Sequence, residues 1–166
     1  MYRILTFIVL LPAISCNKSI NSKWKDCDLS LNFKESRYYV DSLGLEIWHP
    51  SKWMTKEFTD SVSIVNFFYE DRNNFTHITF VSMPPNKFED FWQNIDKDES
   101  LIQKGKITIN GNTFRYVLTS IGQNQFLQTE TLLNNVILLQ VLPQNARNQD
   151  FCETKHVLEN ITFHKD

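Results

Sequence analysis

The chain has 166 residues and a formal net charge of −2, from 17 Lys and Arg against 19 Asp and Glu. Thirteen Phe and four Trp against only four Gly indicate a packed globular domain and exclude a disordered chain. The nearly balanced charge also argues against a nucleic-acid-binding protein, which would favour a basic face.

The first sixteen residues have the order of an export signal. Arg3 precedes an apolar run from Ile4 to Leu11, and small residues then lead into Cys16. The run is too short to cross a bilayer as a helix, which needs about 20 apolar residues. We therefore expect residues 1–15 to be a signal peptide that is removed on maturation.

The end of this signal is compatible with two kinds of processing. Leu11–Cys16 resembles a bacterial lipoprotein box, in which the cysteine receives diacylglycerol and palmitate and becomes the new first residue. The usual leucine three positions before the cysteine is Ala13 here, and Ala13-Ile14-Ser15 would equally suit an ordinary signal peptidase. We favour lipidation of Cys16.

The other two cysteines, Cys27 and Cys152, bear on that choice. If Cys16 carries lipid, they remain as an even pair that can form a disulfide in an oxidising compartment. Ordinary secretion would leave three thiols and one of them unpaired. The alternative is that both are small buried hydrophobic residues.

The composition divides the chain into a signal peptide (1–15), a lipidated N-terminus and tether (16–37) and one domain (38–166). Asn17–Lys25 is polar and has neither helical nor strand periodicity, which predicts a tether that keeps the domain near the membrane. In bacteria rich in surface lipoproteins, acidic residues directly after the lipidated cysteine often direct export to the outside. No acidic residue occurs between Cys16 and Asp26, so the resemblance to such lipoproteins implies a periplasm-facing membrane surface in a bacterial cell envelope.

Short β-rich runs separated by turns predict strands in the domain. The expected strands are Leu45–Trp48, Val62–Tyr69, His77–Met83, the hairpin Ile107–Phe114, and the pair Phe126–Leu132 and Val136–Leu142. Asn110-Gly111 is the clearest turn, because both residues accept the positive φ angles of a two-residue hairpin loop. Asn134-Asn135 is expected to connect the last pair.

Two segments have helical patterns. After Pro84-Pro85, Asn86 is a candidate N-cap with Glu89 bonding back to it, and an apolar stripe follows. The stripe consists of Phe88, Phe91, Trp92 and Ile95. A second helix is expected from near Asn148 to about Asn160, with Phe151, Leu158 and Ile161 on one face. Ile161–Phe163 closes the chain as a last strand or an extended end. The prediction is an α+β fold, with a single antiparallel sheet packed by two helices.

Two segments carry a family resemblance. Leu45-Glu-Ile-Trp-His-Pro-Ser-Lys-Trp53 resembles the Pro-x-x-Trp opening of PsbP/Mog1-like domains, which include DcrB-type bacterial lipoproteins. Val157–Phe163 resembles the helix-to-strand ending of these domains, and the order of elements fits over roughly residues 38–163. The resemblance implies the PsbP/Mog1-like fold and a habit of binding other proteins, without a shared set of catalytic residues.

No pattern in the sequence predicts a catalytic, metal or cofactor site. The four histidines (His49, His77, His156 and His164) are scattered, and Cys152 with His156 at i, i+4 forms only half of a metal site. The cluster of Asp96, Asp98 and Glu99 lacks the glycine and alternating oxygens of a calcium loop. We therefore expect no enzyme activity.

Trp48 and Trp53 lie on either side of Pro50. They are either core residues, the favoured interpretation, or an exposed aromatic contact for a partner, since aromatic residues are enriched in binding hot spots.

The sequence thus favours a lipid-anchored envelope lipoprotein whose domain binds or assembles another envelope protein. The alternatives are a small-ligand carrier, an envelope hydrolase and a toxin-neutralising immunity lipoprotein.

Overall fold

The computed structural model describes residues 19–27, 35–51, 53–57, 63–71, 74–84, 86–133 and 135–164. The predicted signal peptide and the predicted lipidation site, Cys16, lie outside the described residues and stay predictions.

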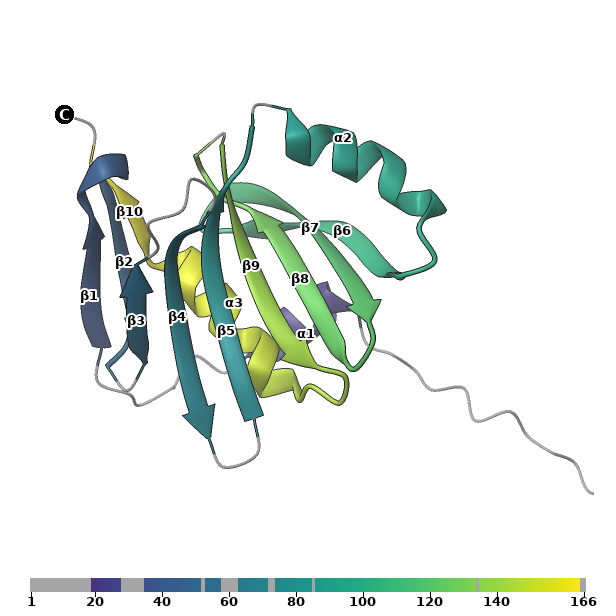
Figure 1. The fold of residues 1–166 in the computed structure, drawn as a ribbon, viewed down its shortest axis with the longest axis horizontal. Helices are drawn as coiled ribbons and strands as arrows, with labels where there is room; N and C mark the ends of the chain where they lie inside the picture. Colours follow the sequence, from purple (N-terminus) through teal and green to yellow (C-terminus); the bar gives the residue numbers. More distant parts are fainter. Residues whose placement is uncertain are drawn as a thin grey trace, which may run out of the picture.

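The domain is α+β, as predicted, but it contains two antiparallel sheets where the sequence predicted one (Figure 1). The smaller sheet has the order β1 (Glu35–Val40), β2 (Leu45–Pro50), β10 (Ile161–Phe163). The larger sheet has the order β3-β4-β5-β9-β8-β7-β6. Its strands are β3 (Met54–Glu57), β4 (Ser63–Asp71), β5 (Asn74–Ser82), β6 (Leu101–Ile109), β7 (Asn112–Ile121), β8 (Asn124–Glu130) and β9 (Val136–Pro143).

The helices are α1 (Ile20–Lys25), α2 (Lys87–Asn94) and α3 (Asn148–Glu159), with short 3₁₀ turns η1 (Asp41–Leu43) and η2 (Ile95–Lys97). The second predicted helix corresponds to α3 and the first to α2, whereas α1 was not predicted. In the view of Figure 1, α1 and α3 lie behind the larger sheet and α2 lies above β6 and β7.

The division into two sheets occurs at Pro50. β2 ends there, and a turn in which the Trp53 amide donates to the Pro50 carbonyl at 2.9 Å leads into β3. β3 then pairs with β4 instead of extending the first sheet. The second partner of β2 is β10, from the C-terminal end of the chain, and Ile161 of β10 lies opposite Ile47.

Gly44 permits this closure of the smaller sheet. Its φ is +55°, and a Cβ atom there would lie 2.5 Å from the carbonyl oxygen of His164. The His164 amide donates to the Gly44 carbonyl at 2.8 Å. Any side chain at position 44 would therefore push the C-terminal strand away from β2.

The predicted Asn-Gly hairpin is confirmed. Asn110 and Gly111 have φ angles of 49° and 80°, and they connect β6 to β7 with Ile109 opposite Asn112. The capping box predicted for α2 is wrong. Asn86 is at the N-cap position but its side chain makes no cap hydrogen bond, because its backbone is left-handed (φ 64°), whereas residues that cap with their side chain are typically extended.

The core lies between the larger sheet and the pair α1–α3. Alternate residues of β7 (Phe114, Tyr116 and Leu118) belong to one buried cluster with Trp24 and Phe151. The Gln140 side chain is fully buried, and its amide donates to the Asp150 carbonyl at 2.7 Å while its oxygen accepts from the Thr154 hydroxyl. These bonds satisfy a buried amide and fix α3 on β9.

The tether predicted for residues 17–25 is wrong from Ile20 onward. Ser19 caps α1 by accepting from the Ser22 amide at 3.2 Å, and Ile20 and Trp24 are both 0% exposed. The Trp24 indole donates to the Phe151 carbonyl at 2.9 Å. The i, i+4 spacing of two apolar residues in a polar segment was the available signal, but one pair does not establish a periodicity.

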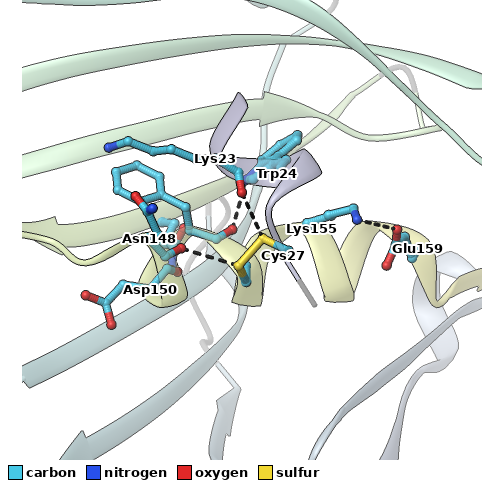
Figure 2. The surroundings of a disulfide bond; sticks show 10 residues. Lys23, Trp24, Cys27, Asn148, Asp150, Lys155 and Glu159 are labelled. Atoms are coloured by element: carbon cyan, nitrogen blue, oxygen red, sulfur yellow. Dashed lines mark hydrogen bonds and ion pairs between the residues drawn. A yellow bond between two sulfur atoms is a disulfide. The ribbon is translucent and has the colours of Figure 1, made fainter. Parts of the chain in front are cut away.

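A disulfide joins Cys27, just after α1, to Cys152 in α3 (Figure 2). The Cα atoms of the two cysteines are 5.5 Å apart, within the usual range of disulfides. The sequence left two alternatives for these cysteines, a disulfide or two small buried hydrophobic residues, and the structure shows the disulfide. The bond joins residues 125 positions apart, and it connects the start of the domain to its last helix.

We predict that alkylation of the unfolded, unreduced protein adds no mass at Cys27 or Cys152. We also expect the Cys27→Ser/Cys152→Ser variant to lose up to about 5 kcal/mol of unfolding free energy, because the closed loop is long. Mass spectrometry and urea unfolding measure the two effects. Alkylation of both residues without reductant would show that the disulfide is absent.

Candidate functional site

A cavity of about 360 Å³ lies where α2 begins, next to β7 and the connection between β8 and β9. We call it the Arg115 cavity. It is lined by Met83, Pro84, Asn86, Phe88, Glu89, Arg115, Glu130, Thr131, Leu133, Asn135, Val136 and Ile137. The volume lies within the range of small-ligand sites, and the lining combines apolar side chains with an ion cluster.

Arg115 of β7 is the centre of this ion cluster. Its guanidinium binds the Glu130 carboxylate through two nitrogens, with Nε donating to Oε2 at 2.7 Å. A third nitrogen, Nη1, donates to Glu89 of α2. The guanidinium carbon also lies 5.5 Å from the ring centre of Phe88 and 5.6 Å from that of Trp92. Arg115 therefore joins β7, β8 and α2.

The hydrogen bonds of this cluster favour the charged forms of Arg115 and Glu89. The hydrogen bonds that Arg115 donates to Glu130, more than the one it donates to Glu89, raise the pKa of Arg115 above its ordinary value. The hydrogen bond from Arg115, and then the one from Gln93, lowers the pKa of Glu89. Arg115 thus remains a cation and Glu89 remains a carboxylate. Such a cluster suits a fixed binding surface better than proton transfer.

A second basic residue holds the other end of α2. The Lys104 ammonium on β6 pairs with Asp96, donates to the Trp92 carbonyl at 3.2 Å and lies 5.2 Å from the Trp92 ring centre. The Arg115 and Lys104 contacts together explain the position of α2 on the larger sheet. Phe88 and Ile95 of the predicted apolar stripe are buried, whereas Phe91 and Trp92 are half-buried.

Trp48 and Trp53 do not form an exposed pair. Trp53 is 5% exposed and packs beside Phe67 and His49, with ring centres 6.3 Å apart in both cases. Trp48 is half-buried under Arg37, whose guanidinium carbon lies 4.0 Å from the ring centre. The partner contact predicted as an alternative is therefore wrong for Trp53, and the favoured core interpretation holds for it.

The histidines remain dispersed in the fold. His49 is buried, its ring nitrogen lies 2.9 Å from the Pro50 carbonyl oxygen, and burial lowers its pKa. His156 lies 3.4 Å from Glu35, and its Cys152 neighbour is in the disulfide. In the part of the chain that the structure describes, no three His, Cys, Asp or Glu residues are grouped as a metal site.

The sequence did not identify Arg115 or Glu130 as site residues, and it assigned Glu89 to a helix cap. Arg115 and Glu130 are brought together by the pairing of β7 with β8, which places Tyr116 opposite Thr129. The alternation of polar residues in these strands was the available signal. It shows only that they share a face and does not indicate that Glu89 joins them.

The arrangement of sheets and helices is similar to that of a known structure, the solution structure of cyanobacterial PsbP (CyanoP) from Synechocystis sp. PCC 6803. The match has a TM-score of 0.50 and covers 83% of this chain and 97% of that chain, at 13% sequence identity. The fold is PsbP-like. At this identity the similarity concerns the fold alone. No family model matches the chain, and no curated protein sequence matches it.

We predict that Arg115→Met lowers the unfolding free energy by about 1–2 kcal/mol, because it removes the guanidinium that binds both the Glu89 and the Glu130 carboxylates. Arg37→Met is the matched control. Arg37 also lies over an aromatic ring, but it is exposed and pairs with a single carboxylate, that of Glu46. Urea unfolding of both variants measures the effect. Equal losses in the two variants would contradict a special role for the Arg115 cluster.

Proposed function

We propose that the protein is an extracytoplasmic lipoprotein whose PsbP-like domain binds another cell-envelope protein without catalysing a reaction. The observation that supports an extracytoplasmic location is the Cys27–Cys152 disulfide. Disulfides form and persist in oxidising compartments, so the bond agrees with the export signal at the N-terminus.

Cysteine pairing also supports lipidation of Cys16. The sequence has three cysteines, and the disulfide uses two of them. Cys16 is then the remaining thiol, at the position where the signal ends. Among the described residues, no helix is long and apolar enough to span a bilayer.

The Arg115 cavity supports a role in protein binding. Leu132, beside the lining residues Thr131 and Leu133, is 46% exposed, and Pro84 is exposed on the α2 side. An apolar rim beside an ordered cluster of charges can bury a partner side chain and also select for its charge. Because the cluster has two carboxylates and one guanidinium, it favours a basic segment of the partner.

A small-ligand carrier is the second candidate function, and the size of the Arg115 cavity favours it. Native mass spectrometry of protein purified from membranes separates the two candidates. A small molecule that is bound to the wild-type protein and absent from the Leu132→Glu variant would favour the carrier.

We predict that the wild-type protein incorporates labelled palmitate and fractionates with membranes, whereas Cys16→Ala does neither. The reason is that no other cysteine has a free thiol for the lipid once Cys27 and Cys152 are paired. Label on Cys16→Ala, or secretion of unlabelled wild-type protein, would contradict the anchor.

We predict that Leu132→Glu reduces recovery of an envelope protein cross-linked to the domain, because it places a charge on the rim of the Arg115 cavity. Met54→Glu is the matched control, since Met54 is 51% exposed but lies on β3, at the far edge of the sheet. Quantitative mass spectrometry of the cross-linked material measures both. Equal recovery with the two variants would exclude this cavity as the binding surface.

A further inference from the structure

Helix α1 determines where the lipid anchor leaves the domain. Ser19, which caps α1, comes only three residues after Cys16. The Ile20 amide donates to the Gln103 side chain at 3.1 Å, and the Asn21 side chain donates to the Lys106 carbonyl at 3.1 Å. Both acceptors belong to β6, so the start of α1 is fixed beside this strand.

Two further interactions keep α1 from separating from the domain. The Trp24 side chain is fully buried, and the disulfide follows directly at Cys27. The start of α1 therefore moves with the folded domain and does not act as part of a linker.

The short distance along the chain limits where the domain can lie. Three residues span at most about 10 Å when extended. If Cys16 carries the lipid, as proposed above, Ser19 must lie within about 10 Å of the lipid-bearing residue. The part of the domain next to Ser19 is then at the membrane surface.

That part is the β6 edge of the larger sheet. β6 is the last strand in the sheet order, and Ile102, directly before Gln103, is a large apolar residue that is 40% exposed. An exposed isoleucine next to Gln103, which binds the start of α1, suits contact with the boundary between headgroups and acyl chains.

We infer that the β6 edge, with the start of α1, is a membrane-contact surface whose partner is the phospholipid bilayer that holds the anchor. Ile102 lies at the level of the headgroups. The sheet extends away from the bilayer, so that β3, at its other edge, is the strand farthest from the lipid. Six strand spacings of about 4.8 Å separate the two edges by roughly 29 Å. This inference depends on the proposed lipidation of Cys16.

Single cysteines at the two edges test the orientation. Ile102→Cys and Met54→Cys replace apolar residues of similar exposure, 40% and 51%, on β6 and β3. Each full-length lipidated variant is reconstituted into phosphatidylethanolamine–phosphatidylglycerol vesicles. Its labelling rate with a bulky, membrane-impermeant maleimide is then measured. The same two substitutions in the Cys16→Ser background supply the soluble reference, and non-reducing mass spectrometry verifies the native disulfide.

We expect the cysteine at position 102 to react several-fold more slowly than that at position 54 on vesicles, and both to react at similar rates in the soluble background. Similar rates on vesicles in a lipidated protein would overturn the orientation while leaving the anchor intact. Failure of the wild-type protein to carry lipid would overturn the anchor and the inference together. The two failures are distinguished by the mass of the purified protein.

Discussion

The packing of α1 against α3 is the constraint on which much of this structure depends. A helix of six residues is not stable by itself in water, so α1 forms because Ile20 and Trp24 are buried and Cys27 is joined to Cys152. In return, α1 binds β6 through the Gln103 side chain and the Lys106 carbonyl. The N-terminal residues of the domain therefore belong to its core.

This constraint also relates the fold to the membrane. A long flexible tether would allow a lipidated domain to take any orientation, and a short one would not. Because α1 consumes most of the segment that follows Cys16, the proposed anchor leaves the domain beside β6. The Arg115 cavity lies next to α2 and only one strand in from β6, because Arg115 is opposite Lys106 in the register of β6 and β7.

The ion cluster in that cavity is better understood as an ordered surface than as a reactive site. Arg115 contacts Glu130 and Glu89 at the same time, and these interactions lower the pKa of Glu89 and raise that of Arg115. Both effects hold the groups in one charge state over the physiological range. The cluster positions α2 and gives the cavity a defined charge, which are properties of a recognition surface.

The sequence by itself determined the local elements, because their signals lie within a few residues. Asn110-Gly111 specified the β6–β7 hairpin, and the spacing of apolar residues specified α3. It also specified the α+β class, which the PsbP-like fold confirms. Only the tertiary structure decided which distant residues meet. Ile161 pairs with Ile47, Trp24 packs under Phe151 and Arg115 joins Glu89, and no periodicity in one chain records these contacts. The physical reason is that a short amphipathic segment such as α1, or a lone charged residue, is stabilised by partners far away in sequence.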